Sequence, residues 1–279
     1  MADQVKAACI QVCAGPEVQP NLAATSELIR RARDQGAEFI LTPENAVMME
    51  PRRGPKFEKA EREENPYILP VFSELAIETG TWILAGSLAV KIPNEERLAN
   101  RSYLFDPEGR IAARYDKIHM FDVDLANGET YRESSQFRPG DRAVVAETPF
   151  GIVGLTVCYD LRFPALHRAL AQAGATILTS PAAFTVPTGR AHWHTLLRAR
   201  AIENTCFVLA PAQTGTHADG RGTYGHSLII DPWGEILAEA DSEPGLITAT
   251  LDLGRLAETR AMIPSLHHDR EWRLPDRIG

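Results

Sequence analysis

The chain of 279 residues carries a formal net charge of -8 at pH 7, and 44% of its residues are hydrophobic against 24% charged. This composition is typical of a soluble globular protein with a large core. The acidic balance argues against a general nucleic-acid or anionic-membrane surface, which needs clustered Lys and Arg, so we expect neither as a partner.

The N-terminal segment, MADQVKAACIQV, has no basic region before a long apolar run, and no apolar run elsewhere approaches the length of a membrane span. The chain has four cysteines and no C-x-x-C pair. A disulfide framework is therefore not expected, and we expect a cytoplasmic protein. The cysteines are Cys9, Cys13, Cys158 and Cys206.

Strand-like and helix-like segments alternate through the first half of the chain. Asn21 is a predicted N-cap, and Gly36 a predicted helix stop. The charged, turn-rich stretch at 49–65 predicts a surface loop placed over a site. The other predicted elements are strands at 5–13, 37–44 and 81–90, helices at 21–36 and within 64–80, and a hairpin at 101–117 that turns at 106–109.

The second half repeats this scheme, and the alternation predicts a mixed α/β fold with helices covering sheets. No Pro/Ser-rich linker divides the chain, so we expect a single domain over residues 1–279. A polar tail from about residue 264 is expected to reach a partner subunit. The predicted elements are strands at 151–160, 175–184, 206–213 and 245–253, helices at 163–174, 189–205 and 255–262, and a hairpin at 226–239 that turns at 231–234.

Familiar cofactor and metal motifs are missing from the sequence. GRGTYG, at 220–225, matches G-x-G-x-x-G, but a loop precedes it and a strand-like run follows, so it does not predict a dinucleotide site. A flexible glycine loop near the site is the better interpretation. The eight histidines form no zinc pattern. We therefore expect no metal and no organic cofactor.

Cys158 ends an apolar run in GLTVCYDLRFP and is followed at once by polar residues. A free cysteine is more often a small buried hydrophobic residue. A thiol at a strand exit, on a sharp turn into a helix, is instead presented as a nucleophile with backbone N–H groups around it. This context favours a catalytic role.

Three further charged residues are candidates for the same site. Glu44 ends FILTPE, and Lys117 ends ARYDK, so each directly follows an apolar strand, where α/β proteins place functional groups. Glu133 lies in GETYRESS. Taken alone, each of the three would be a surface charge.

Together, LTPE, RYDKIHMFD and GLTVCYDLRFP resemble the three signatures of the nitrilase superfamily of carbon–nitrogen hydrolases, in the right order and at similar separations. The resemblance covers nearly the whole chain. It implies a four-layer α-β-β-α sandwich. It also implies hydrolysis of a carbon–nitrogen amide bond through a cysteine thioester, with release of ammonia.

The implied mechanism gives each candidate a role. Glu44 is the general base for the thiol of Cys158, which attacks the amide carbon. Lys117 and the backbone N–H of Tyr159 stabilise the oxyanion. Glu133 keeps Lys117 charged and oriented.

An acidic substrate needs a further cation. Arg162, four residues after Cys158, is expected to bind its carboxylate, and a structural salt bridge to Asp160 is the alternative. The resemblance also places Phe184 and Thr188 at the pocket wall.

Within the superfamily, CYDLRFP and KIHMFD are most similar to the Nit branch, whose members hydrolyse terminal amides of small 2-oxo acid compounds such as deaminated glutathione and 2-oxoglutaramate. His194 stands where Glu is expected in that branch. The alternatives are an N-carbamoyl amino acid hydrolase, a nitrilase, or a catalytically silent binding protein. A homodimer or larger even-numbered assembly is expected, with helices near 163–173 and 190–204 at the interface.

Overall fold

The computed structural model describes residues 3–125, 128–271 and 273. One six-stranded sheet has the order β16-β1-β2-β3-β4-β5, in which β1, β2 and β3 run parallel. The bounds of its strands are β1 Gln4–Gln11, β2 Phe39–Leu41, β3 Trp82–Val90, β4 Ala99–Phe105, β5 Ile111–Asp116 and β16 Gly245–Asp252.

The second six-stranded sheet has the order β15-β14-β11-β10-β9-β8, in which β9, β10 and β11 run parallel. Its strands are β8 Val144–Thr148, β9 Gly151–Leu155, β10 Ile177–Thr179, β11 Phe207–Ala210, β14 Leu228–Ile230 and β15 Ile236–Glu239. Two small hairpins lie outside the sheets: β6 Asp122–Asp124 with β7 Thr130–Arg132, and β12 Thr214–Thr216 with β13 Gly222–Tyr224.

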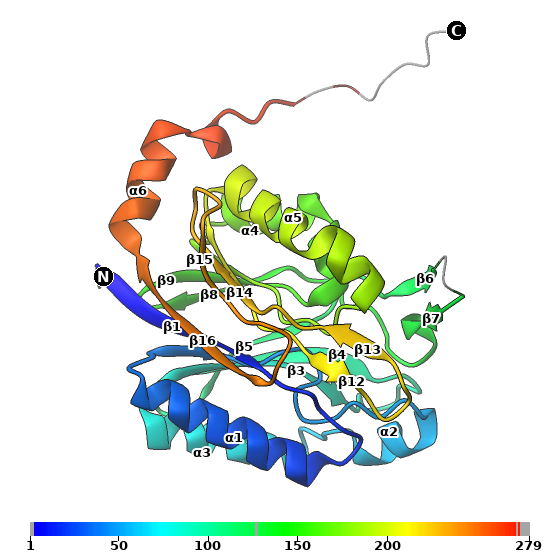
Figure 1. Cartoon of the computed structure of the whole chain (residues 1–279). Helices are drawn as coiled ribbons and strands as arrows, with labels where there is room; N and C mark the ends of the chain where they lie inside the picture. Colours follow the sequence, from blue (N-terminus) through cyan, green and yellow to red (C-terminus); the bar gives the residue numbers. More distant parts are fainter. Residues whose placement is uncertain (1–2, 126–127, 272, 274–279) are drawn as a thin grey trace, which may run out of the picture.

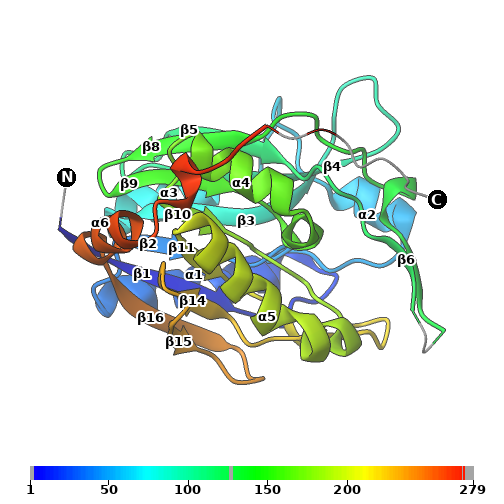
Figure 2. The same cartoon turned by 90° about the horizontal axis from the view of Figure 1, so that it is seen from above.

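Helices cover the outer face of each sheet (Figure 1). The helices are α1 Val18–Asp34, α2 Arg53–Lys59, α3 Leu69–Thr79, α4 Pro164–Gln172, α5 Val186–Asn204 and α6 Leu253–Met262, with 3-10 turns η1 Glu133–Ser135, η2 Cys158–Arg162 and η3 Ser265–His267. Helices α1 and α3 lie on one side of the sandwich, and α4 and α5 on the other. Figure 2 shows α4 and α5 side by side over the second sheet. The predicted four-layer α-β-β-α sandwich is confirmed.

The core follows from the two-residue period of the strands. In β1, Val5, Ala7 and Cys9 pack into the cluster that joins the two sheets. Ala8 and Ile10 alternate with them and pack toward α1 and α3. Both faces of this strand are apolar because both are covered, which is why it reads as a continuous apolar run.

Several local predictions are wrong. Helix α1 begins at Val18, since Pro20 is tolerated in a first turn. Asn21 is therefore not the N-cap, and its amide binds the backbone of Gly15 and Val47 instead. The stretch at 49–65 is not simply a surface loop, because it contains α2 and the fully buried Glu61.

A further wrong prediction is the strand at 151–160. Strand β9 ends at Leu155, and the chain turns into η2 at Cys158. The short hairpins β6–β7 and β12–β13 were not predicted, because three-residue strands are too short to show an alternating pattern.

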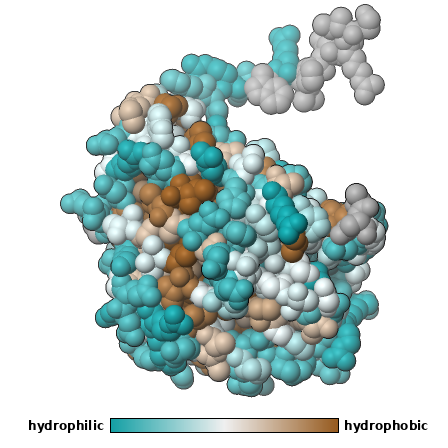
Figure 3. All heavy atoms as spheres, viewed as in Figure 1, coloured by the Kyte–Doolittle hydropathy of each residue, from teal (hydrophilic) through white to brown (hydrophobic). Residues whose placement is uncertain are grey.

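Exposed apolar side chains gather on one face of the molecule, seen in brown in Figure 3. Large exposed ones come from the end of α5 and from the β14–β15 hairpin, namely Ile202, Trp233, Ile236 and Leu237. The association of copies through α4 and α5 stays a prediction. So does the role of the tail, of which residue 272 and residues 274–279 lie outside the described residues. No helix in the described ranges is long and apolar enough to cross a membrane.

Gly86, in β3, is closely approached by atoms of two other segments of the chain, one at Thr42 and Pro43 and one at Pro181. A Cβ there would lie 1.9 Å from the carbonyl oxygen of Thr42 and 2.7 Å from atoms of Pro43 and Pro181. We expect Gly86→Ala to lower the free energy of unfolding by about 1–3 kcal/mol or more, because backbone atoms cannot move aside. A urea unfolding titration of the variant and the wild type measures this change in the free energy of unfolding.

Gly54→Ala is the matched control, because Gly54 lies in α2 with nothing within 4 Å of its Cβ position. It should be neutral or slightly stabilising. Equal stability of the two variants would contradict the close approach at Gly86.

Candidate active site

Cys158 lies at the start of η2, three residues after Leu155, the last residue of β9. Its φ of +50° is in the left-handed region, which a non-glycine residue adopts only at a cost. The backbone holds this conformation: the N–H of Cys158 donates to the carbonyl of Pro181 at 2.8 Å. The side chain is buried but lines the main pocket. The strained turn presents the thiol to that pocket.

Asp160 holds the turn to the rest of the site, and the sequence reasoning assigned it no such role. Its carboxylate accepts hydrogen bonds from the N–H of Val157 at 2.9 Å and the hydroxyl of Tyr115 at 2.7 Å. Its other oxygen contacts the backbone N–H of His119 at 3.0 Å and the Nδ1 of that ring at 2.7 Å. Asp160 is fully buried, so these four contacts replace its solvation.

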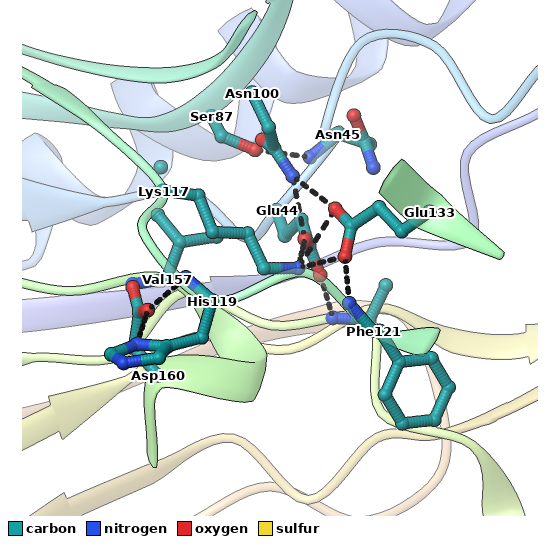
Figure 4. Close-up of polar contacts among 12 residues, drawn as sticks. Glu44, Asn45, Ser87, Asn100, Lys117, His119, Phe121, Glu133, Val157 and Asp160 are labelled. Carbon is teal, nitrogen blue, oxygen red and sulfur yellow. Dashed lines mark hydrogen bonds and ion pairs between the residues drawn. The ribbon is translucent and has the colours of Figure 1, made fainter. Parts of the chain in front are cut away.

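Glu44, Lys117 and Glu133 meet at the side of the pocket, as Figure 4 shows. The Nζ of Lys117 donates to Glu44 at 3.0 Å and to the two oxygens of Glu133 at 2.9 and 2.8 Å. The thiol of Cys158 lines the same pocket and lies near enough to Glu44 for the carboxylate to raise its pKa. The structure therefore brings all four predicted catalytic residues together.

Asn100, on β4, is a further member that was not predicted. Its Nδ2 donates to Glu44 at 2.9 Å and to Glu133 at 3.1 Å. The second oxygen of Glu44 accepts from the backbone N–H of Ala183 at 2.9 Å, and Phe121 N–H donates to Glu133 at 2.7 Å. An uncharged amide and backbone groups leave no trace in a search for charged residues, so no sequence signal pointed to them.

The electrostatics set the resting protonation states. Burial alone would raise the pKa of Glu44, but the charge of Lys117 and the hydrogen bonds from Cys158, Lys117 and Asn100 bring it below the usual value. Burial would lower the pKa of Lys117, and the carboxylates of Glu133 and Glu44 raise it well above the usual value. Burial and then the charge of Glu44 raise the pKa of the Cys158 thiol. The resting site thus holds an ionised base beside a protonated thiol.

The pocket has a volume of about 330 Å³, which suits a small molecule. Of the predicted substrate-binding residues, Tyr159, Phe184 and Thr188 line it.

Arg162 is not among the lining residues. Its guanidinium lies 3.3 Å from the Nδ1 of His192 and over the rings of Tyr159 and Phe184. It forms no ion pair with Asp160, whose oxygens are used elsewhere. Its role as a carboxylate ligand stays a prediction.

His194 lies outside the pocket, where it meets His226 and Glu239. Both rings approach the same carboxylate oxygen, at 2.9 and 3.0 Å. Two imidazoles and a carboxylate are ligands that a divalent transition metal accepts, and this is the one such group of three found in the described part of the chain. In the structure the three groups satisfy one another by hydrogen bonding.

The comparisons with known proteins agree with this geometry. The family model for carbon–nitrogen hydrolase matches residues 6–261. A deaminated glutathione amidase from Synechocystis is 43% identical over 94% of this chain and 97% of its own length. The human deaminated glutathione amidase is 39% identical over 98% of this chain and 83% of its own length.

Solved structures show the same fold. The Nit-Fhit protein of C. elegans superposes with a TM-score of 0.89 at 33% identity, over 97% of this chain and 66% of that one. Nit3 of Saccharomyces cerevisiae, described as a member of branch 10 of the nitrilase superfamily, has a TM-score of 0.86 at 27% identity, over 95% and 96%. On its fold, its site and these relatives, the chain belongs to the Nit branch of the carbon–nitrogen hydrolases.

Proposed function

We propose that this protein hydrolyses the amide bond of a small carboxylate-bearing substrate, with deaminated glutathione the first choice and 2-oxoglutaramate the second. The observation that carries the proposal is the thiol of Cys158, which lines one pocket together with the hydrogen-bonded pair of Glu44 and Lys117. The printed names of the relatives support the first substrate.

The first half of the reaction forms a thioester. Glu44 removes the proton of the Cys158 thiol as the sulfur attacks the amide carbon. The carbonyl oxygen becomes an oxyanion, which the ammonium of Lys117 and the backbone N–H of Tyr159 stabilise. Glu44, now protonated, gives its proton to the leaving nitrogen, and the C–N bond breaks.

The second half regenerates the enzyme. Glu44 takes a proton from water, whose oxygen attacks the thioester, and the acid product leaves with the thiol restored. A primary amide such as 2-oxoglutaramate releases ammonia. Deaminated glutathione is a secondary amide and releases the amine of a dipeptide. The steps at the thiol are the same for both.

Two further parts of the proposal concern the setting of the enzyme. The reaction needs no metal and no organic cofactor, because thiol, base and oxyanion donors come from the chain itself. A cytoplasmic location suits the four cysteines, which are all free thiols.

Substrate preference tests the proposal. We expect kcat/KM for deaminated glutathione or 2-oxoglutaramate to exceed that for aliphatic nitriles and N-carbamoyl amino acids of similar size. Competition assays that follow both products give the ratio directly. Preference for a nitrile or a carbamoyl compound over every 2-oxo acid amide would reject the substrate and leave the cysteine mechanism standing.

Cys158→Ala is expected to remove turnover while the protein stays folded, because the covalent step needs the sulfur. With wild-type enzyme and a slow substrate, mass spectrometry should find the acyl group on Cys158. Cys13→Ala is the matched control, since Cys13 is the one exposed thiol of the four. It should keep full activity, and an acyl adduct on Cys13 instead would overturn the assignment.

Asn100→Ala is expected to shift the acidic limb of the pH profile of kcat/KM to higher pH. Glu44 must be ionised to act as base, and its lowered pKa keeps it ionised at a more acidic pH than an ordinary glutamate. Loss of the Asn100 hydrogen bond raises that pKa, so activity is lost at a higher pH. A pH profile from 4 to 8 measures the shift.

Gln213→Ala serves as the control for this profile. Gln213 donates to the backbone carbonyl of Glu44 at 3.0 Å and does not touch its carboxylate. The acidic limb of the pH profile of Gln213→Ala should stay where it is in the wild type. An unshifted limb in Asn100→Ala would mean that this hydrogen bond does not tune the base.

A further inference from the structure

Besides Lys117, three cationic side chains line the pocket, and two of them, Lys56 and Arg221, form no ion pair with the described residues, whereas Arg132 is paired with Asp124. Lys56 comes from α2, and Arg221 precedes β13. Figures 1 and 2 both draw α2 and the β12–β13 hairpin toward the same end of the sandwich. The hairpin also contacts the segment before α2, because the guanidinium of Arg221 reaches within 3.9 Å of the sulfur of Met49.

Neither cation has an ionic partner among the described residues. The Nζ of Lys56 donates to the neutral amide oxygen of Gln136 at 2.8 Å and lies 5.3 Å from the ring centre of Phe137. Arg221 lies over the ring of Tyr131 at 5.7 Å. Its Nε is buried and has no hydrogen-bond acceptor. A buried charged donor without an acceptor is costly, and native structures contain few of them.

Two of the nearby carboxylates are already paired with other cations. Glu133 binds Lys117, and Glu50 binds Arg52 and Lys59. Asp219 accepts from the backbone N–H of Arg221 at 3.0 Å, not from its guanidinium.

The two cations also act on each other. Burial, and then the charge of Arg221, lower the pKa of Lys56 to about 8, against the weaker effect of Glu133, Glu50 and Asp219. Two like charges at a pocket wall repel, and an anion between them would relieve both the repulsion and the missing hydrogen bond.

We infer that Lys56 and Arg221 form the subsite that binds the carboxylate of the amide substrate. The guanidinium offers its Nε and a terminal nitrogen as a fork for the two carboxylate oxygens, and the ammonium adds a point charge. The inference rests on the proposed function and deepens it, because it explains why an acidic amide is preferred. It also gives this task to residues far from Cys158 in sequence, in place of Arg162.

The test compares 2-oxoglutaramate with its neutral methyl ester in Lys56→Gln and Arg221→Gln. Each variant should raise KM for the acid by roughly tenfold or more, the effect of losing one charge-assisted hydrogen bond. The KM for the ester and kcat for both substrates should stay within about threefold. Arg221→Lys should recover part of the loss, since it keeps the charge without the fork.

Two variants serve as controls. Arg132 also lines the pocket, but it is paired with Asp124 at 2.8 Å, so Arg132→Gln should leave the acid-to-ester ratio unchanged. Arg162→Gln tests the earlier prediction. If it alone removes the preference for the acid, the subsite inference is overturned.

The pH dependence separates binding from a structural role. The ammonium of Lys56 is present below its pKa and lost above it, so the acid-to-ester ratio of kcat/KM should fall between pH 7 and 9 in the wild type. In Lys56→Gln the ratio should be flat. An equal loss of kcat on both substrates, with no change in the ratio, would show a structural role only.

A binding measurement on the inactive Cys158→Ala variant tests the subsite independently of the proposed reaction. Titration calorimetry of 2-oxoglutarate into Cys158→Ala should show binding that Lys56→Gln or Arg221→Gln weakens by roughly tenfold. If wild-type enzyme hydrolyses no 2-oxo acid amide but this difference is seen, the substrate assignment fails and the subsite stands. The subsite is rejected if Cys158→Ala does not bind 2-oxoglutarate detectably. It is also rejected if adding Lys56→Gln and adding Arg221→Gln each leave this binding unchanged.

Discussion

The buried ammonium of Lys117 is the constraint on which the rest of the site depends. It is 1% exposed, and an isolated charge at such a position would lose its proton or unfold the region around it. Two carboxylates prevent this, one from Glu44 and one from Glu133. Burial and then the charge of Glu44 oppose early ionisation of the Cys158 thiol, and the ammonium of Lys117 offsets only part of this. The thiol therefore stays protonated until a substrate carbonyl carbon is in position for attack by the sulfur.

This cluster also joins the two sheets. Glu44 and Lys117 follow strands of the first sheet, β2 and β5, whereas Cys158 follows β9 of the second. Asp160 adds a second connection, because it ties the turn at Cys158 to Tyr115 on β5. The close approach at Gly86 lets the segments around Thr42 and Pro181 meet. The packing of the sandwich and the geometry of the reacting groups are thus one arrangement, so a fault in either is expected to harm both.

Each part of the site that could be predicted carries a signal in the sequence itself. Glu44 and Cys158 each follow a buried apolar strand, and such a break in an apolar run is visible in the sequence. Lys117 follows the half-exposed strand β5 and was found through its RYDK motif. Asn100 and Asp160 were not found, since their work is to hydrogen-bond segments that only the fold brings together. For the same reason, Arg162 was favoured as a carboxylate ligand because it is close to Cys158 in sequence. Lys56 and Arg221, which line the pocket, are distant from it along the chain.

The helices and strands also divide into those that the sequence predicts and those that only the fold reveals. Long buried strands such as β1 and β3 were predicted, because burial on both faces gives an apolar run. Strand β13 was taken for a flexible glycine loop, since its three residues carry no alternating pattern of their own. They pair with β12 and, at Thr223, with Thr185. That hairpin nevertheless places Arg221 at the pocket. The sequence signal is weakest where short connecting segments, not the core, decide what the site binds.

At position 194 this chain has a histidine where the family pattern has a glutamate, and the neighbouring residues fit the histidine. A glutamate at this position would face the carboxylate of Glu239, and two like charges at hydrogen-bond distance repel. The histidine instead contacts that carboxylate at 2.9 Å, and His226 contacts the same oxygen from the other side. The group lies outside the pocket-lining residues. His194 therefore bears on how α5 meets the β14–β15 hairpin, and it gives no ground for moving the substrate away from an acidic amide.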